Sequence, residues 1–564
     1  MSAQTRNLIA PIVPMPLIAA ILLWGCGDSD GVSADAGTDT DADTDTDADT
    51  DADAGADAGE DTETESDTGE ECEDVDPFDP AGCGGTAPSP CVFYVNSTAT
   101  SESDGLSWTT AFSKVQDGID AARCAVLAVG DTCQVWVAAG THYVYRDCIW
   151  DTVRLREGVE LYGGFAGVET ALEQRDWETN VTILDGHASE GSEERSVHVV
   201  TGSDATLLDG FTIAGGSANP IMTWQITEWD YYGAGMRNLG VSPTVRHCAF
   251  ADNAAVMSAG AVLNVDAAPV IEECTFSGNT ATSNGGAILS SGSAPAFSAC
   301  TFTGNSAGNY GGAVFDSDGS ESLFSDCAFF DNSAPYGGAV RVVGSTASFE
   351  RCVFRDNSAS IETSTGGAVD SENSVVTIAH SVFLGNMSDY GGALSAFGSA
   401  VAASSSVFAD NGATYGGAIY DHDSTISSYT NCSFAGNTAS TAGGAIAGAF
   451  ALTEITVANS ILWDNGADPI ALFEDATATV TYSDIEGGYD GGVGNIDADP
   501  LFVDAAAGDF HLTAGSPCID AANGDLAPEF DIEGFSRWDD PDVTNTGVGT
   551  PDYTDMGAYE KQTD

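Results

Sequence analysis

The feature that most constrains this chain is a repeat that begins near Cys248. Each unit carries a string such as "CTFSGNTATSNGGAI", in which Phe, Asn and a Gly-Gly pair recur in a fixed order. A unit of this size cannot bury a core alone, so neighbouring units have to stack. The Asn of successive units recurs every 25 to 29 residues, at Asn253, Asn279, Asn305, Asn332, Asn357, Asn386, Asn411, Asn437 and Asn465.

One coil of a parallel β-helix needs about that much chain for three short strands and three turns. The 66 Gly of this 564-residue chain suit many tight turns far better than long helices. We therefore predict an all-β fold, a right-handed single-stranded parallel β-helix (solenoid) that runs from about Tyr94 to Leu512. Helix is expected to be a minor component.

Each conserved-looking position of the unit has a structural interpretation. In "CTF" the Cys and Phe are two residues apart, so both point into the coil while Thr faces out. Asn suits a turn because it tolerates left-handed backbone, and its amide can bond to the Asn of the next coil. Gly-Gly supplies a second bend that a Cβ would obstruct.

Cysteines fall into two groups. The first group shares one repeat position. It contains no C-x₂-C pairs and has no His partners, so a metal or redox role is a poor interpretation, and we expect a column of small buried side chains. In the second group some should form disulfides, and Cys124 with Cys133 is the easiest local pair to close. The first group comprises Cys248, Cys274, Cys300, Cys327, Cys352 and Cys432; the second comprises Cys72, Cys83, Cys91, Cys124, Cys133, Cys148 and Cys518.

The first 25 residues are typical of a cleaved export signal. Arg6 supplies the positive end, and an apolar run interrupted by prolines extends from Leu8 to Trp24. The run ends in "LWGC", which resembles the bacterial lipobox, and the resemblance implies that Cys26 is acylated and anchors the protein to a membrane. The alternative is ordinary signal cleavage nearby, with Cys26 a free or lost thiol.

An acidic segment follows the signal. From Asp28 to Asp76 the chain alternates Asp with Thr, Ala or Gly and contains no Lys, Arg or His. We predict a disordered, extended tether within residues 26–90, because such a segment cannot bury enough apolar surface to fold. Asp-x-Asp-x-Asp resembles part of a calcium loop, so Ca²⁺ is the one cofactor considered, although the complete loop pattern is missing.

The net charge of −71 bears on the partners of the whole chain. It results from 86 acidic and only 15 basic residues, which argues against any partner that must be held through its phosphates. Nucleic acid is therefore not expected as a partner.

The remaining chain divides into three predicted parts, 91–206, 207–482 and 483–564. The first should contain a short capping helix, because Phe112, Val115, Ile119 and Ala122 share one helical face. The second holds the repeats, and the third should supply the last coils and a cap. Capping is needed because the ends of a β-helix expose unpaired sheet edges.

Longer sequence segments resemble known protein families. "VFYVNSTATSESDGLSWTTAF" and "VWVAAGTHYV" near the start, and "IDADPLFVDAAAGDFHLTAGSPCIDAA" with "DMGAYE" near the end, resemble bacterial surface β-helix proteins of the pectin-lyase-like superfamily with varied anchors. The "FxxN" and "GGA[ILV]" units are similar to the repeats of chlamydial polymorphic outer-membrane proteins. Those proteins continue into a translocating barrel, whereas this chain ends at Asp564, so we do not expect an autotransporter.

Carboxylates follow the Gly-Gly-Ala turn in two units. Aligning the units places Asp316 and Asp421 in one column four coils apart, roughly 19 Å at one coil per 4.8 Å, too far to cooperate in sugar hydrolysis. We interpret them as exposed loop carboxylates and assign no catalytic residue. The residues concerned are Asp316 and Asp318 in one unit and Asp421, His422 and Asp423 in the other, with Val342, Ser371 and Ala396 between them in the column.

Arg341 lies one position before that column. Basic side chains are few between Leu207 and Tyr482, so a proton-abstracting lyase residue would stand out there. The simpler interpretation is a surface Arg paired with Asp370 and stacked on Phe315, each on a neighbouring coil.

The residue before Gly-Gly forms a partly aromatic column. Such a column could lie flat against sugar rings or a partner's side chains, or its Tyr could simply pack over the glycine bend. Both interpretations remain open. Down the stack the column contains Tyr232, Ser258, Asn284, Tyr310, Tyr336, Thr365, Tyr390, Tyr415 and Ala442.

Together these features favour a non-enzymatic lipoprotein of the outer membrane or cell surface, or a secreted one. We expect an adhesin or envelope component that binds glycans or protein partners. The alternative is a polysaccharide lyase or glycoside hydrolase of the pectin-lyase-like superfamily.

Overall fold

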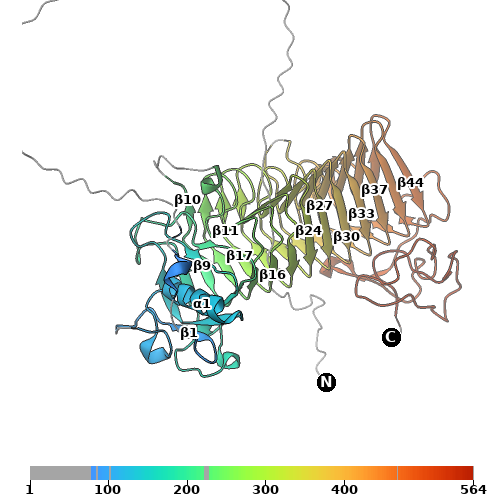
Figure 1. Ribbon diagram of the computed structural model, residues 1–564. Helices are drawn as coiled ribbons and strands as arrows, with labels where there is room; N and C mark the ends of the chain where they lie inside the picture. Colours follow the sequence, from blue (N-terminus) through green and yellow to red (C-terminus); the bar gives the residue numbers. More distant parts are fainter. Residues whose placement is uncertain are drawn as a thin grey trace, which may run out of the picture. The chain divides into compact units, whose positions relative to one another are not determined.

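The computed structural model describes residues 76, 78–83, 87–100, 103–220, 228–361, 363–466 and 468–562. The export signal, Cys26 and nearly all of the Asp-rich segment predicted to be a tether lie outside these ranges. The described residues form a stack of β-coils, so the predicted parallel β-solenoid is confirmed (Figure 1). No helix within these ranges is long and apolar enough to cross a membrane.

Three long parallel sheets build the solenoid, and each coil contributes one short strand to each sheet. Sheet A contains β1 (Val92–Val95), β2 (Cys133–Ala138), β5 (Val159–Phe165), β8 (Leu207–Asp209), β12 (Thr244–Arg246), β16 (Val270–Glu272), β20 (Ala296–Ser298), β24 (Glu321–Ser325), β27 (Thr346–Glu350), β30 (Val375–Ala379), β33 (Ala400–Ser404), β37 (Ile426–Thr430), β41 (Glu454–Ala458) and β44 (Thr477–Thr481).

Sheet B follows sheet A along each coil after a two-residue bend. It contains β3 (Gly140–Tyr143), β6 (Thr182–Asp185), β9 (Thr212–Ala214), β13 (Ala249–Ala251), β17 (Thr275–Ser277), β21 (Thr301–Thr303), β25 (Ala328–Phe330), β28 (Val353–Arg355), β31 (Val382–Leu384), β34 (Val407–Ala409), β38 (Ser433–Ala435), β42 (Ile461–Trp463) and β45 (Asp484–Ile485).

Sheet C follows the Gly-Gly bend. It contains β4 (Val153–Arg154), β7 (Val200–Thr201), β11 (Met236–Leu239), β15 (Val262–Val265), β19 (Ile288–Ser291), β23 (Val314–Ser317), β26 (Val340–Val343), β29 (Val369–Glu372), β32 (Leu394–Phe397), β36 (Ile419–His422), β40 (Ile446–Ala449) and β43 (Ile470–Leu472).

Short ladders follow the Asn turn between sheets B and C. They are formed by β10 (Ser217–Ala218), β14 (Ala254–Ala255), β18 (Thr280–Ala281) and β22 (Ser306–Ala307), and by β35 (Gly412–Tyr415) with β39 (Thr438–Ala442). Single-turn 3₁₀ segments occur at η1 (Pro80–Gly82), η2 (Trp108–Thr110), η3 (Leu172–Gln174), η4 (Glu228–Tyr231) and η5 (Ala505–Ala507).

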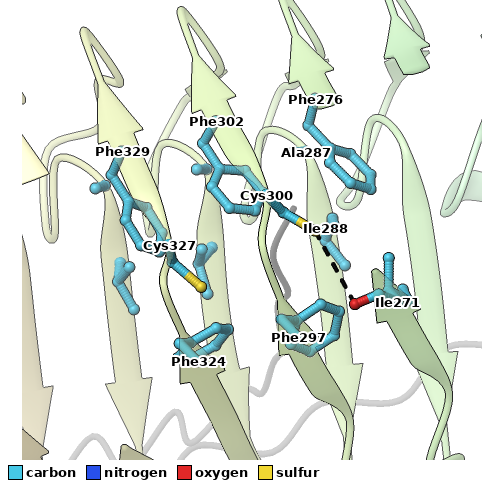
Figure 2. Close-up of a cluster of buried hydrophobic side chains, with 14 of the residues drawn as sticks. Ile271, Phe276, Ala287, Ile288, Phe297, Cys300, Phe302, Phe324, Cys327 and Phe329 are labelled. Atoms are coloured by element: carbon cyan, nitrogen blue, oxygen red, sulfur yellow. Dashed lines mark hydrogen bonds between the residues drawn. The ribbon is translucent and has the colours of Figure 1, made fainter. Parts of the chain in front are cut away.

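Stacked phenylalanines fill the interior, as the spacing in "CTF" predicts. Phe276 on β17 stacks on Phe302 on β21 with ring centroids 5.5 Å apart, and Phe302 stacks on Phe329 on β25 at 4.8 Å. Figure 2 shows this column beside a second one from sheet A that includes Phe297 and Phe324. All are buried, and each coil therefore packs its apolar side chains onto the same side chains of the next coil.

The Asn residues form a buried amide ladder, also as predicted. The Asn305 side chain donates to Oδ1 of Asn332 at 3.0 Å and to the carbonyl of Phe276 at 3.0 Å. Its own Oδ1 accepts the backbone N–H of Asn279 at 3.0 Å. The left-handed residue of the turn, however, is the one before Asn, such as Gly304 (φ 62°) or Asp331 (φ 54°), because Asn itself must aim its amide along the stack.

The Gly-Gly bend has the predicted steric cause. Gly285 has a φ of +57°, and a Cβ on Gly286 would lie 2.0 Å from the carbonyl oxygen of Gly312 in the next coil. Only residues without a Cβ allow coils to approach this closely at the bend.

The cysteine column is buried and its members are free thiols. Ser381 and Ser406 occupy the same column in coils that lack Cys, since the amide of Cys352 donates to Oγ of Ser381 just as the amide of Cys274 donates to Sγ of Cys300. Burial raises the pKa of the Cys300 thiol well above its ordinary value. The column thus consists of small inward side chains that also accept one backbone bond per coil.

The N-terminal cap is the predicted helix. Helix α1 (Val115–Val129) buries Val115, Ile119 and Ala122, whereas Phe112 lies before the helix and packs against the same core. Figure 1 shows α1 beside the first coils.

The predicted Cys124–Cys133 disulfide is wrong. The structure has Cys83–Cys124 and Cys91–Cys133 instead, and Cys148 is also disulfide-bonded. The reason is the register of β1 on β2, which pairs Val92 with Gln134 and so brings the two preceding cysteines side by side.

The parallel ladders end at Ile485 rather than at Leu512. Beyond them β46 (Phe502–Asp504) and β47 (Asp509–Leu512) form an antiparallel pair. The segment from residue 513 to 562 then folds back against the side of sheet B. Nδ2 of Asn431 donates to the carbonyl of Asp555 at 3.0 Å, and Oγ of Ser405 donates to the carbonyl of Phe530 at 3.0 Å.

Candidate functional site

The outer side of sheet C between β23 and β36 combines aromatic and charged side chains, and we call it the sheet C face. One outward column contains Phe315, Arg341, Asp370, Ser395 and Tyr420, in the register expected from the aligned units. A second, two residues further along each strand, contains Val343, Glu372, Phe397 and His422. The tyrosines that precede Gly-Gly border this face.

Asp316 and Asp421 do not belong to the sheet C face. Both side chains are fully buried inside the coil, so their interpretation as exposed loop carboxylates is wrong. The aligned column itself is confirmed, since Asp316, Val342, Ser371, Ala396 and Asp421 pair in that order. Strand alternation explains the burial, because Asp316 is two residues after the inward Val314.

Burial perturbs both carboxyls strongly. It raises the pKa of Asp316 to about 8 and that of Asp421 to about 6. Asp316 accepts a bond from Oγ of Ser322 at 2.8 Å, and Asp421 accepts bonds from Ser427 at 2.6 Å and Tyr429 at 3.0 Å. Neither can reach a substrate outside the coil. Asp318, in contrast, is exposed at the turn, as predicted.

Arg341 holds the charged centre of the sheet C face. Its guanidinium bonds to Asp370 and to Glu372, so the expected pairing with Asp370 is confirmed. It lies 5.1 Å from the ring centroid of Tyr310 and 5.7 Å from that of Tyr336.

Two expectations for Arg341 are wrong. The side chain stacks on the two tyrosines instead of on Phe315, and it is only 9% exposed rather than a surface residue. Burial lowers the pKa of the guanidinium, and Glu372 with the two tyrosines opposes that effect. Its position explains the burial, because Tyr310 and Tyr336, from the Gly-Gly bends of two successive coils, cover the guanidinium.

The tyrosine column follows the predicted register from Asn284 to Ala442. Tyr390 stacks on Tyr415 with centroids 5.5 Å apart and planes 7° apart, and Tyr310 contacts Tyr336 at 5.5 Å. These four rings are half-buried, so each keeps part of its surface open to solvent. Thr365 interrupts the column between the two pairs.

Tyr232, the first tyrosine of the column, is only 5% exposed. It packs into the main hydrophobic cluster and contacts Trp229 at 5.8 Å between ring centroids. Tyr232 therefore presents almost no surface to a ligand, unlike the four rings further down the stack.

Tyr420 and His422 extend the aromatic patch at the last coils of the face. Tyr420 contacts Tyr390 at 5.0 Å between ring centroids, and His422 contacts Phe397 at 5.1 Å. Burial lowers the pKa of His422, although its Nδ1 lies 3.1 Å from Oδ2 of Asp423. Sequence reasoning missed Tyr420, Phe397 and Glu372 as neighbours. The outward parity of each sheet C strand is the signal that could have found them.

A cavity of about 460 Å³ lies beside α1 and the first coils. Its lining includes Lys114, Arg146 and Arg156 as well as the aromatic Trp150. The cationic character is partly offset, because Arg156 bonds to Asp76 at 2.7 Å and to Asp120 at 3.0 Å. Within the ranges that the structure describes, no three His, Cys, Asp or Glu side chains are grouped so as to hold a metal ion.

Comparison with known proteins addresses the fold. Residues 232–411 match the family model described as "right handed beta helix region". The solenoid is a right-handed parallel β-helix. This match covers the general β-helix repeat, and a search of curated proteins found no match to the chain.

The similarity of this chain to solved structures is distant. Pectate lyase Pel9A is 13% identical with a TM-score of 0.28, covering 84% of this chain and 96% of that one. Tailspike protein 3 of bacteriophage CBA120 is 13% identical with a TM-score of 0.39, covering 72% and 60%. The GH87 α-1,3-glucanase catalytic unit of Streptomyces thermodiastaticus strain HF3-3 is 12% identical with a TM-score of 0.27, covering 71% and 65%.

Proposed function

We propose that this protein is a non-catalytic, surface-displayed β-helix that binds a neutral polysaccharide along the sheet C face. The observation that carries the proposal is the set of half-buried rings, Tyr310, Tyr336, Tyr390 and Tyr415, aligned beside the Arg341 ion pairs. Coils are spaced by about 4.8 Å, so the two tyrosine pairs follow one another along the stack, and the Arg341 ion pairs lie beside them. A polymer with a repeating unit is the natural ligand for such a surface.

The chemistry of the face favours sugars without charge. Tyrosine rings offer flat apolar surfaces with a polar hydroxyl at one end, which suits the mixed character of a sugar ring. Carboxylate oxygens such as those of Glu372 accept hydrogen bonds from sugar hydroxyls. The charge of Arg341 is already matched by two carboxylates, and the chain carries a net charge of −71, so polyanionic glycans are disfavoured.

Two observations support binding rather than cleavage. Asp316 and Asp421, the carboxylates that sequence reasoning weighed for catalysis, lie inside the coil. Asp370 and Glu372, on the outer side of sheet C, are both bonded to the same guanidinium, and Asp370 is itself buried. Sugar hydrolysis instead requires one carboxyl that protonates the leaving group and a second that acts on the ring or on water.

We further propose that the protein is exported and anchored by a lipid. The "LWGC" string and the likeness of the repeats and the closing segment to surface β-helix proteins support export, with a lipid on Cys26 as the anchor. Metabolic labelling with a fatty acid should mark the wild-type protein and not the Cys26→Ser variant. Equal labelling of both would contradict the anchor without affecting the binding proposal.

Binding is tested by affinity electrophoresis of the full chain through gels that contain neutral or uronate-rich polysaccharides. We expect retardation by at least one neutral polymer. Tyr336→Ala and Tyr390→Ala should each weaken it roughly 3- to 10-fold through loss of ring contact. The matched control is Tyr143→Ala, an exposed tyrosine at the first coils.

Thermal unfolding of each variant separates loss of binding from loss of fold. If both Tyr variants stay folded and migrate like wild type, the sheet C face is not the binding site. If instead a polysaccharide is depolymerised, and Glu372→Gln abolishes the cleavage, the protein is a lyase or hydrolase and the binding proposal fails.

A further inference from the structure

The C-terminal segment of residues 513–562 is ordered without regular strands or helices. It contains 11 Asp and Glu residues and only two basic ones, Arg537 and Lys561. Irregular backbone of this charge is held together only if its carboxylates have partners.

Four carboxylates of the segment are buried, and three of them are satisfied. Asp531 accepts three backbone amides at 2.7 to 3.0 Å, and Asp555 accepts two at 2.7 Å each. Glu560 bonds to Arg537 at 2.8 Å. The fourth, Asp520, differs from all of these.

Asp520 is fully buried, and neither of its carboxylate oxygens has a hydrogen-bond partner. The hydroxyl of Thr554, also fully buried in this segment, lacks a partner as well. Burial is the largest effect on the carboxyl of Asp520, and together with the nearby charge of Asp539 it raises the pKa to about 7. The backbone amide of Asp540 has a smaller effect in the opposite direction. An unpaired buried carboxylate that faces further acids points to an absent positive partner.

We propose that Asp520 anchors a Ca²⁺ site in the C-terminal segment, with Asp539 or Asp540 as the second carboxylate. Ca²⁺ fits because it prefers hard oxygen ligands and accepts backbone carbonyls and water beside carboxylates. Such a site needs only two acidic side chains, which agrees with the lack of a grouping of three within the described ranges. The inference is independent of polysaccharide binding on the sheet C face.

The site has a structural consequence. Asp520 also receives contacts through its backbone, since its N–H donates to Asp555 and its carbonyl accepts the amides of Thr546 and Gly547. The same segment bonds to the bend before β38 through Asn431. Bound Ca²⁺ would therefore fix three stretches of irregular chain against the side of the last coils.

Thermal unfolding of the full chain tests the proposal. We expect millimolar Ca²⁺ to raise the Tm by roughly 2–4 °C over a sample in EGTA, with Mg²⁺ less effective. The Asp520→Asn variant should unfold at the same temperature with and without Ca²⁺. Its control, Glu529→Gln, removes the same charge from an exposed position of the segment and should keep the wild-type response.

Terbium luminescence supplies a second measurement if Asp520→Asn does not fold. Tb³⁺ replaces Ca²⁺ on oxygen ligands, and Trp538 next to Asp539 should sensitise its emission. We expect emission from the wild-type chain that Ca²⁺ displaces and that falls severalfold in Trp538→Phe. Unchanged emission in Trp538→Phe, or a Tm that Ca²⁺ shifts equally in wild type and Asp520→Asn, would overturn the site and place any Ca²⁺ elsewhere, such as the Asp-rich segment.

Discussion

The coils of the solenoid and the C-terminal segment satisfy buried polar groups in opposite ways. Within the coils, the amide of Asn332 bonds to Asn357, which bonds to Asn386, so each residue is satisfied by its own equivalent one coil away. In the C-terminal segment Asp531, Asp555 and Glu560 each have a different set of partners, and the carboxylate of Asp520 has none. Repetition thus satisfies the Asn ladder of the coils, whereas irregular chain requires a separate solution at each position.

The Gly-Gly bend provides the strongest test of the repetitive mode. A Cβ on Gly338 would lie 2.1 Å from the carbonyl oxygen of Gly367 in the next coil, so Gly338→Ala should force the coils apart. We expect a loss of about 4 kcal/mol or more in the free energy of unfolding, measured by denaturant titration. Gly344→Ala is the control, because its Cβ would meet open space and only its φ of +57° is strained, at about 1–2 kcal/mol. Equal effects would contradict the steric account.

The Asn ladder should respond nearly as strongly. Asn332→Ala removes two bonds donated by the side chain, to Phe302 and Asn357, and the acceptor used by Asn305. We expect a loss of about 3 kcal/mol, because buried groups in two coils are left unpaired. Asn309→Ala, at an exposed position, should change stability by about 0.5 kcal/mol or less. A small effect at Asn332 would mean that the coils do not depend on the ladder.

Asp316 is a buried carboxyl at a position where the neighbouring coils carry Ser290 and Val342. The folded state keeps the proton up to about pH 8, whereas the unfolded chain releases it near pH 4, so this group stabilises the fold below pH 4 and loses that contribution as the pH rises. Unfolding titrations between pH 5 and 8 should show that Asp316→Asn removes a slope of roughly 1.4 kcal/mol per pH unit. Asp318→Asn, at the exposed turn, should keep the wild-type slope; identical slopes for both variants would place Asp316 in contact with water.

The cysteine column should give the smallest effect. Cys300→Ser mimics the chain's own choice at Ser381 and Ser406, where the hydroxyl accepts the same backbone amide. We expect a loss of about 1 kcal/mol, from the smaller apolar volume, in the same denaturant titration. A loss as large as that of Asn332→Ala would show that the thiol itself, rather than a small acceptor, is required.

Much of the fold follows from the repeat because equivalent residues of successive coils must meet. The Phe, Asn, Gly-Gly and Tyr columns were all predictable for that reason, as was the helix that covers the first coils. Some features had a signal that went unused. Alternation from Val314 places Asp316 inside, and the Asp or Gly before each Asn marks the left-handed residue of the turn.

Other features had no signal in the chain alone. The pairing of Cys91 with Cys133 depends on how β1 lies on β2, outside the repeats. The stacking of Arg341 on Tyr310 depends on side chains that cross from one coil to the next. The charge of Asp539 acts on Asp520 only because the irregular segment returns on itself.

By itself, the sequence of this protein determined the coil, its period and its interior, since one local rule applied at each repeat is enough to define a stack. Only the tertiary structure decided which polar groups are enclosed, which are paired across coils and which are left without partners. The reason is that these outcomes depend on distances between residues with no shared repeat position, and no local pattern encodes such distances.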